Sequence, residues 1–284
     1  MRLFSHHVNG VAHLGIHRDG RPTDLGRGSL REILRDGGLQ RLATGPLGLA
    51  MDREAMHYLP LIPNPSKIIC VGLNYRAHRA EAGLGKGARY PDFFVRVATT
   101  LTAHRAALQR PRCSRELDWE GELAVIVGRV ARHVPAASAL DVVAGYSVFN
   151  EASIRDYQFR ASQWTWGKNF DRTGAFGPDL VTPDELPRSV KAGLHIETRL
   201  NGQVMQSATT ADLIFDVPTL IAMLSEGMTL EPGDVIVTGT PDGVGFTRKP
   251  PVFMAAGDIV EVEIEGVGLL RNRIEDEPES AAGA

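Results

Sequence analysis

The sequence contains only two cysteines, Cys70 and Cys113, among its 284 residues. So few cysteines exclude a disulfide framework and suit a reducing compartment, where Cys70 in the apolar run KIICVGL is a small core residue. Long apolar runs are also lacking, since none reaches the about 18 residues that a membrane-spanning helix needs. We therefore expect no membrane span, and because no signal peptide is recognisable we expect a cytoplasmic protein.

An excess of charge of either sign is also lacking. The chain has 31 lysines and arginines against 34 aspartates and glutamates, and no basic stretch that would follow a phosphate backbone. Nucleic acid is therefore not an expected partner. With 43% hydrophobic residues, the chain is long enough for one large core, or for a large domain beside a small one.

Residues 1–60 are predicted to form a small separate unit. Two turn signals, Asn9–Gly10 and Asp19–Gly20, lie between short apolar stretches and predict β-hairpins. Ser29 and Glu32 form a capping box at the start of a short helix. A proline-rich stretch over residues 60–67 then reads as a linker.

Four histidines of this unit, His6, His7, His13 and His17, lie close together in the sequence. Strand alternation predicts that His13 and His17 occupy strand faces. We do not predict a metal site there.

From Lys67 onward, apolar runs separated by turns predict a β-rich α+β fold with a few covering helices. The predicted helices cover residues 74–83, 137–146 and 215–227, the last capped by Asp216 and ended by Gly227. The predicted strands lie within residues 67–73, 122–128, 144–150, 177–182, 194–205, 234–239 and 259–274.

Glu120 and Glu122 lie one residue apart in DWEGELAVIVG, at the start of a run that reads as a buried strand. Alternate side chains of a strand point to the same face, so both carboxylates point the same way and Gly121 leaves space on the other face. Two buried like charges need a positive partner. If the strand that ends at Glu151 is a neighbour, three carboxylates converge, and such oxygen ligands favour Mg²⁺, Mn²⁺ or Ca²⁺ over zinc. Surface ion pairs on an exposed strand are the alternative.

His78 and Glu81 are three residues apart, which places them on one face of a helical turn. A carboxylate beside a histidine fixes its tautomer and raises its basicity, so the pair can draw a proton from water. A solvated helix face is the alternative interpretation.

Seven stretches give the sequence a resemblance to the fumarylacetoacetate hydrolase family, in the branch of bacterial acylpyruvate hydrolases and 2-hydroxyhepta-2,4-diene-1,7-dioate isomerases. The resemblance extends from about Lys67 to Ile274 and implies a mixed β-barrel or rolled-sheet core with a small N-terminal domain. It implies domains at 1–60 and 67–276 and a homodimer, while the small and polar residues at the end of the chain predict a flexible tail at 277–284. The matching stretches are VGLNYRAH, DWEGELAVIVG, GYSVFNEASIRDYQ, WGKNF, TRLNGQVMQ, LEPGDVIVTGTPDGVG and GDIVEVEIEGVG.

The resemblance implies a divalent metal, Mg²⁺ or Mn²⁺ with Ca²⁺ as a further option, bound by Glu120, Glu122 and Glu151. Most members of the family have aspartate at the position of Glu151. His78 and Glu81 match the dyad that activates water in the family.

Lys168 in WGKNF matches the family's active-site lysine, which stabilises developing negative charge; an exposed loop lysine is the alternative. Arg155, Gln158 and Thr240 match positions that contact substrate oxygens, although Arg155 can instead pair Asp156 or a metal-ligand carboxylate.

Arg96 lies where the family often has lysine. There it either keeps a positive charge at the rim of the pocket or faces solvent from a strand.

By this resemblance, the expected function is metal-dependent hydrolysis of a C–C bond in an acylpyruvate, giving pyruvate and a carboxylic acid. The substrate is then a small 2-oxo acid. An isomerase or decarboxylase of a 2-oxo diacid from aromatic catabolism is the alternative. A catalytically inactive metal-binding homologue is the third possibility.

Overall fold

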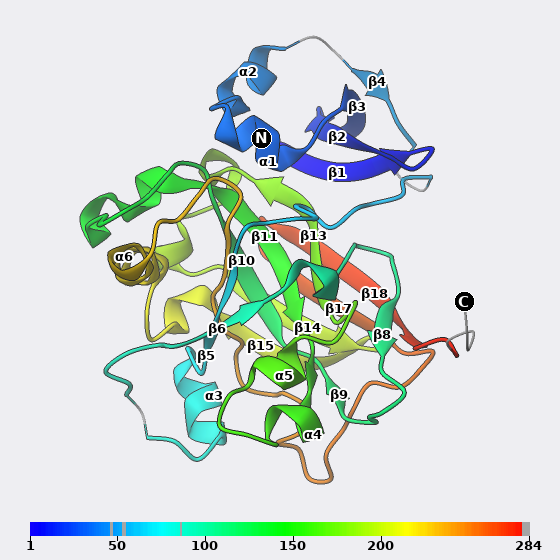
Figure 1. The fold of residues 1–284 in the computed structure, drawn as a ribbon, viewed down its shortest axis with the longest axis vertical. Helices are drawn as coiled ribbons and strands as arrows, with labels where there is room; N and C mark the ends of the chain where they lie inside the picture. Colours follow the sequence, from blue (N-terminus) through cyan, green and yellow to red (C-terminus); the bar gives the residue numbers. More distant parts are fainter. Residues whose placement is uncertain (46–47, 53–54, 86, 280–284) are drawn as a thin grey trace.

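The computed structural model describes residues 1–45, 48–52, 55–85 and 87–279 (Figure 1). Strands dominate and form three sheets, which confirms the predicted β-rich α+β class. Across these described ranges, no helix is both long and apolar enough to span a bilayer. The predicted tail at 277–284 lies mostly outside the described residues.

The largest sheet has eleven strands. In spatial order they are β4 (Leu49–Ala50), β3 (Arg21–Arg27), β2 (Val11–Arg18), β1 (Arg2–Val8), β13 (Gly174–Val181), β11 (Val143–Glu151), β10 (Gly121–Val127), β16 (Val235–Val237), β5 (Ile68–Gly72) and β6 (Asp92–Arg96), with β7 (Leu101–Thr102) paired to β13. All the predicted strands from residue 67 onward lie in this sheet or in the next.

The second sheet has five strands: β15 (Gln203–Thr209), β14 (His195–Leu200), β17 (Ile259–Ile264), β18 (Gly268–Asp276) and β8 (Leu108–Arg110). A small third sheet pairs β12 (Ser153–Ile154) with β9 (Leu117–Asp118). The α-helices are α1 (Leu30–Arg35), α2 (Leu39–Thr44), α3 (Arg76–Glu81), α4 (Arg155–Gln158), α5 (Thr165–Lys168) and α6 (Val217–Gly227). The 3₁₀ helices are η1 (Ala98–Thr100), η2 (Ala136–Val142), η3 (Pro183–Glu185), η4 (Val190–Ala192) and η5 (Thr210–Asp212).

The core lies on both faces of strand β10, which explains its uninterrupted apolar run. Leu123 and Val125 belong to one buried cluster together with residues of the five-stranded sheet, such as Val262. Ala124 and Ile126 belong to a second cluster on the opposite face, which includes residues of β1, β2 and α1. Because side chains alternate, Glu120 and Glu122 share the face of Ala124 and Ile126, away from the five-stranded sheet.

The N-terminal residues form the two predicted β-hairpins. The turn residues Asn9 and Gly10 have φ of 51° and 78°, and Asp19 and Gly20 have φ of 50° and 75°. Positive φ at both central residues is the type I′ geometry that Asn-Gly and Asp-Gly favour. Strand β1 also pairs antiparallel with β13, so the N-terminal strands extend the largest sheet.

The predicted helix ends are confirmed at two helices. Ser29 and Glu32 form the capping box of α1, and Asp216 caps α6, which ends at Gly227. The predicted helix at 137–146 is instead the 3₁₀ helix η2 followed by strand β11. The consecutive β-branched residues Val142 and Val143 favour the extended backbone that begins there.

Gly121 lies between the two glutamates, and the packing around it requires glycine, since no larger side chain fits there. A Cβ at this residue would lie 2.2 Å from Thr198 Oγ1 and 2.9 Å from Val262 Cγ1 in the facing sheet. Gly121→Ala should therefore destabilise the protein by about 1–3 kcal/mol, as over-packing of a core does. Denaturant unfolding measures this loss. Gly227→Ala is the matched control, because a Cβ there meets nothing within 4 Å, and equal stability of the two variants would contradict the packing argument.

Candidate active site

A cavity of about 220 Å³ lies against the face of β10 that carries the two glutamates. Strands β5 and β6, helices α3, α4 and α5 with the residues next to them, and the loop after β16 form the rest of its wall. Seven of the predicted site residues line it: His78, Glu120, Glu122, Arg155, Gln158, Lys168 and Thr240. The sequence motifs, which are far apart in the chain, therefore converge on one pocket.

The three predicted metal-ligating carboxylates lie together. Glu120 and Glu122 are at the start of β10 and Glu151 ends β11, and these strands pair antiparallel with Gly121 opposite Asn150. The three side chains offer oxygen atoms that all lie within 4.8 Å of one another. All three residues are buried, with Glu151 fully inaccessible. The alternative of surface ion pairs is therefore wrong.

Three buried cations surround these carboxylates. Lys168 Nζ donates to Glu120 Oε2 at 2.9 Å and also to Glu151. Arg155 pairs with Glu120 at 2.7 Å, and Arg96 donates to the other oxygen of Glu151. Lys168 is thus a buried pocket residue rather than an exposed loop lysine. These are the positive partners that two buried like charges require.

Of the three carboxylates, Glu122 is the one whose charge these cations compensate least. The donor to its side chain is the backbone N–H of Gly239. Burial, and then the charges of Glu151 and Glu120, raise the pKa of Glu122 well above its usual range. In Glu120, by contrast, Lys168 and Arg155 outweigh the effect of burial and lower the pKa.

These carboxylates fit a hard divalent cation. They supply three oxygen donors without a sulfur or nitrogen ligand, the donor set that Mg²⁺ and Mn²⁺ take. Because negative charge is in excess around Glu122, a further positive charge bound there would be stabilised. The site therefore matches the predicted metal in chemistry.

His78 and Glu81 form the predicted dyad at the end of α3. His78 Nδ1 lies 3.1 Å from Glu81 Oε2. Glu81 also accepts the Thr247 hydroxyl at 2.7 Å and the Gly243 N–H at 3.2 Å. Although burial opposes it, these hydrogen bonds keep the pKa of Glu81 below its usual range. An ionised Glu81 holds the proton of His78 on Nδ1, which leaves Nε2 of a pocket-lining ring as the basic atom.

Arg155 supports the carboxylates and does not pair with Asp156. Its Nε donates to Asp118 at 2.8 Å and its Nη1 to Gln158 Oε1 at 2.8 Å. Asp156 instead accepts the hydroxyl of Ser114. Of the two pairings expected for Arg155, the structure has the one with a metal-ligand carboxylate, Glu120.

Arg96 does not lie at the rim of the pocket, nor does it face solvent, and both expectations for it are wrong. It is buried behind Glu151, where it also donates to Ala152 O and to Thr173 Oγ1. Glutamate reaches one methylene further than aspartate, and here it reaches the Arg96 guanidinium.

Arg96 and Glu151 are therefore in direct contact. We predict that they are energetically coupled. Arg96→Lys and Glu151→Asp should each destabilise the fold, and the double variant should be more stable than their sum by about 0.5–3 kcal/mol. Denaturant unfolding of the four proteins gives this coupling energy, and simple additivity would contradict it.

Sequence reasoning missed two polar residues and, apart from Trp164, the aromatic wall. Asp118 is fully buried and accepts the N–H groups of Gly245 and Phe246 as well as Arg155. Its spacing of two from Glu120 is the signal that could have found it. Gln206 accepts the Gly121 N–H at 3.0 Å and donates to Thr240 Oγ1 at 2.8 Å. The aromatic residues that line the cavity are Phe94, Phe159, Trp164 and Phe246.

Comparisons with known proteins give a family match and several relatives. The family model described as "Fumarylacetoacetate (FAA) hydrolase C-terminal" matches residues 67–275. The mitochondrial oxaloacetate tautomerase Fahd2a of Rattus norvegicus is 39% identical over 251 residues, which cover 83% of this chain and 79% of that protein.

Two solved structures share the whole fold. The 5-carboxymethyl-2-hydroxymuconate delta-isomerase of Mycobacterium smegmatis superposes with a TM-score of 0.79 at 31% identity, over 98% of this chain and 100% of that one. The maleylpyruvate hydrolase of Sphingobium sp. SYK-6, in complex with manganese(II) and pyruvate, gives a TM-score of 0.80 at 27% identity with the same coverage. The chain belongs to the fumarylacetoacetate hydrolase family, in the branch that includes these bacterial hydrolases and isomerases.

Proposed function

We propose that this enzyme hydrolyses a C–C bond of an acylpyruvate-type 2,4-dioxo acid, giving pyruvate and a carboxylic acid. One observation carries the proposal: two of the three converging carboxylates, Glu120 and Glu122, line a pocket that is also lined by His78, a base oriented by Glu81. A metal site beside a positioned base is what water attack on a chelating 2-oxo acid requires.

Glu120, Glu122 and Glu151 would hold Mg²⁺ or Mn²⁺ in this proposal. When bound, the ion would supply Lewis-acid polarisation of the substrate's carboxylate and 2-oxo oxygens. Manganese(II) and pyruvate in the Sphingobium structure support this choice of metal and ligand.

The chain's own residues supply the remaining steps. His78 Nε2 takes a proton from water, and the resulting hydroxide adds to the distal carbonyl carbon of the substrate. The bond between that carbon and the CH₂ group breaks, and His78 Nε2 returns the proton taken from water to the CH₂ carbon, which becomes the methyl group of pyruvate. Lys168 keeps its proton, because the charges of Glu120 and Glu151 outweigh burial and raise its pKa, and it stabilises negative charge in the pocket.

Gln158 and Thr240 line the same cavity and offer polar groups that can orient a bound acid. The aromatic wall limits the entry of bulk water.

Tautomerisation of oxaloacetate is the second candidate, because relatives 39–40% identical to this chain carry that activity in their names. The same base suffices for it: His78 Nε2 would move a proton between C3 and the 2-oxo oxygen, with no water consumed. The complete dyad and carboxylate set speak against a catalytically inactive homologue.

A substrate panel separates these functions. Acetylpyruvate, oxaloacetate and a hydroxymuconate-type acid are each assayed with Mg²⁺, with Mn²⁺ and with EDTA. Metal-dependent release of pyruvate and acetate from acetylpyruvate supports the hydrolase. Enol–keto conversion of oxaloacetate alone supports the tautomerase, and conversion of the muconate alone supports an isomerase. Loss of CO₂ from oxaloacetate alone supports a decarboxylase.

We also propose that the enzyme is a homodimer. Phe93 and Val95 occupy alternate positions on β6, at the end of the largest sheet, and Val97 directly follows this strand; the three residues are 40–51% exposed. Three exposed apolar residues so close together favour burial against a second copy. We expect sedimentation at twice the mass of one chain, and Val95→Glu should shift it towards the monomer. A wild-type monomer would contradict the proposal.

A further inference from the structure

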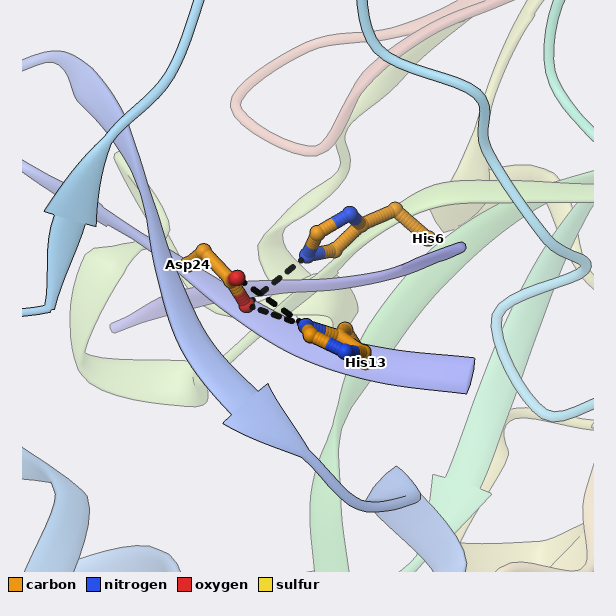
Figure 2. A group of neighbouring side chains, drawn as sticks. All are labelled: His6, His13 and Asp24. Carbon is orange, nitrogen blue, oxygen red and sulfur yellow. Dashed lines mark hydrogen bonds and ion pairs between the residues drawn. The ribbon is translucent and has the colours of Figure 1, made fainter. Parts of the chain in front are cut away.

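A second cluster of metal-binding side chains lies in the N-terminal hairpins. His6 on β1 stands directly opposite His13 on β2, and Asp24 on β3 stands opposite Gly15, two residues beyond His13. The pleat therefore directs all three side chains to one face of three neighbouring strands. Figure 2 shows both imidazole rings directing a nitrogen at the carboxylate of Asp24.

The distances between these atoms are close to those of a metal coordination sphere. Asp24 Oδ1 lies 3.2 Å from His6 Nε2 and 3.0 Å from His13 Nδ1, and the three ligand atoms all lie within 4.8 Å of one another. Tetrahedral Zn²⁺ with bonds of about 2.0–2.1 Å places its ligand atoms about 3.3–3.4 Å apart. Small rotations of the side chains are enough to bring the set onto one ion.

We propose that His6, His13 and Asp24 form a binding site for Zn²⁺ or a divalent transition metal of similar size. Two imidazole nitrogens select this class of ion over Mg²⁺ and Ca²⁺, which take oxygen ligands. Three protein ligands leave a coordination position for water. The side chain of His6 is fully buried, whereas those of His13 and Asp24 are each 15% exposed, so an ion can reach the site from solvent.

The surroundings already hold the ligands in place. The N–H of Gly26 donates to Asp24 Oδ1 at 2.8 Å, which fixes the carboxylate as an outer partner of a metal ligand does. The ring of His6 packs against those of Phe4 and His13, with centroids 5.4 Å and 5.6 Å away. A site whose ligands are ordered before the ion arrives loses less entropy on binding.

The ion would clamp three strands and take no part in the chemistry of the pocket. Figure 1 shows β1, β2 and β3 at the opposite end of the view from α3, α4 and α5, which line the pocket. Binding to the folded state alone would raise the stability of the protein.

The test uses untagged, chelator-treated protein in excess Mg²⁺, with Zn²⁺ and Co²⁺ as probes. We expect one equivalent of Zn²⁺ to bind, to raise the midpoint of thermal unfolding, and to be replaceable by Co²⁺ with visible d–d absorption. His13→Ala and Asp24→Asn should each weaken binding by at least about 10-fold, the smallest loss found even for residues that only orient a ligand. Circular dichroism verifies that both variants fold.

Two control variants separate this site from others. His133→Ala removes an exposed histidine elsewhere on the surface and should keep the bound equivalent. Glu122→Gln alters the carboxylate pocket and should also keep it, so the outcome is independent of the proposed activity. If His13→Ala binds Zn²⁺ as tightly as the wild type, or if the wild type binds none, the three residues are only a hydrogen-bonded tie and the proposal is wrong.

Discussion

Replacing His78 with alanine should lower kcat for acylpyruvate hydrolysis by about 10²–10⁴-fold, the usual contribution of a positioned general base. His78 is the only histidine among the residues that line the described cavity, and its Nε2 is the basic atom there. Glu120 and Glu151 do not replace it, because Lys168 holds both, and Glu122 is a proposed metal ligand. Mn²⁺ binding, measured by calorimetry, should stay close to that of the wild type.

Activities that need no base distinguish a role of His78 as general base from a purely structural role. Decarboxylation of oxaloacetate depends on the metal more than on a base, so it should fall much less than hydrolysis in His78→Ala. Glu81→Gln should show an intermediate loss, because the ring stays in the pocket while its orienting charge is gone. The exposed His133→Ala is the control. Equal loss of hydrolysis and decarboxylation would sink the assignment of His78 as the base.

Features set by neighbouring residues could be predicted from the sequence. The Asn9–Gly10 turn needs positive φ at two adjacent residues, and few residues other than Asn and Gly adopt it at low cost. The shared face of Glu120 and Glu122 follows from the two-residue period of a strand. Close packing against Gly121 also follows from the sequence, since a buried strand has a neighbour on each face.

Contacts between distant segments could not be read from any local pattern. Arg96 meets Glu151 across 55 positions of the chain, and only the pairing of β5 with β6 beside the pocket brings it there. A strand arginine with apolar neighbours looks the same in sequence whether it faces solvent or a buried carboxylate. Asp118 was missed for a related reason, because its role as partner of Arg155 depends on the fold of α4 against β9 and β12.

The N-terminal histidines illustrate the same limit. Spacing along one strand predicts which side chains share its face, and the two-residue Asn9–Gly10 turn fixes the register that places His6 opposite His13. The position of Asp24 depends in addition on an irregularity in the pairing of β2 with β3, between His13 and Gly15. Bulges of this kind re-aim a side chain and leave little trace in sequence.

Glu122→Gln should remove metal binding while leaving the metal-free protein folded. In the metal-free state burial, and then the charges of Glu151 and Glu120, raise the pKa of Glu122 and so favour its protonated form. Glutamine has nearly the shape of a protonated glutamate and can still accept the N–H of Gly239. It lacks the negative charge that a hard cation needs, so affinity for Mg²⁺ and Mn²⁺ should fall by more than about 100-fold, the upper range for losing only an outer partner.

The pH dependence of stability and of binding gives this prediction its sharpest test. A carboxyl whose pKa is raised on folding stabilises the folded state below its ordinary pKa, and this contribution is lost as pH rises through the folded-state value. Metal-free wild type should therefore lose stability over that range, and Glu122→Gln, which cannot ionise, should lose less. Wild type should also release up to about one proton for each ion bound, whereas the variant releases fewer. Calorimetry in two buffers of different ionisation enthalpy measures this number, and wild-type affinity or proton release in Glu122→Gln would mean that Glu122 is not a ligand.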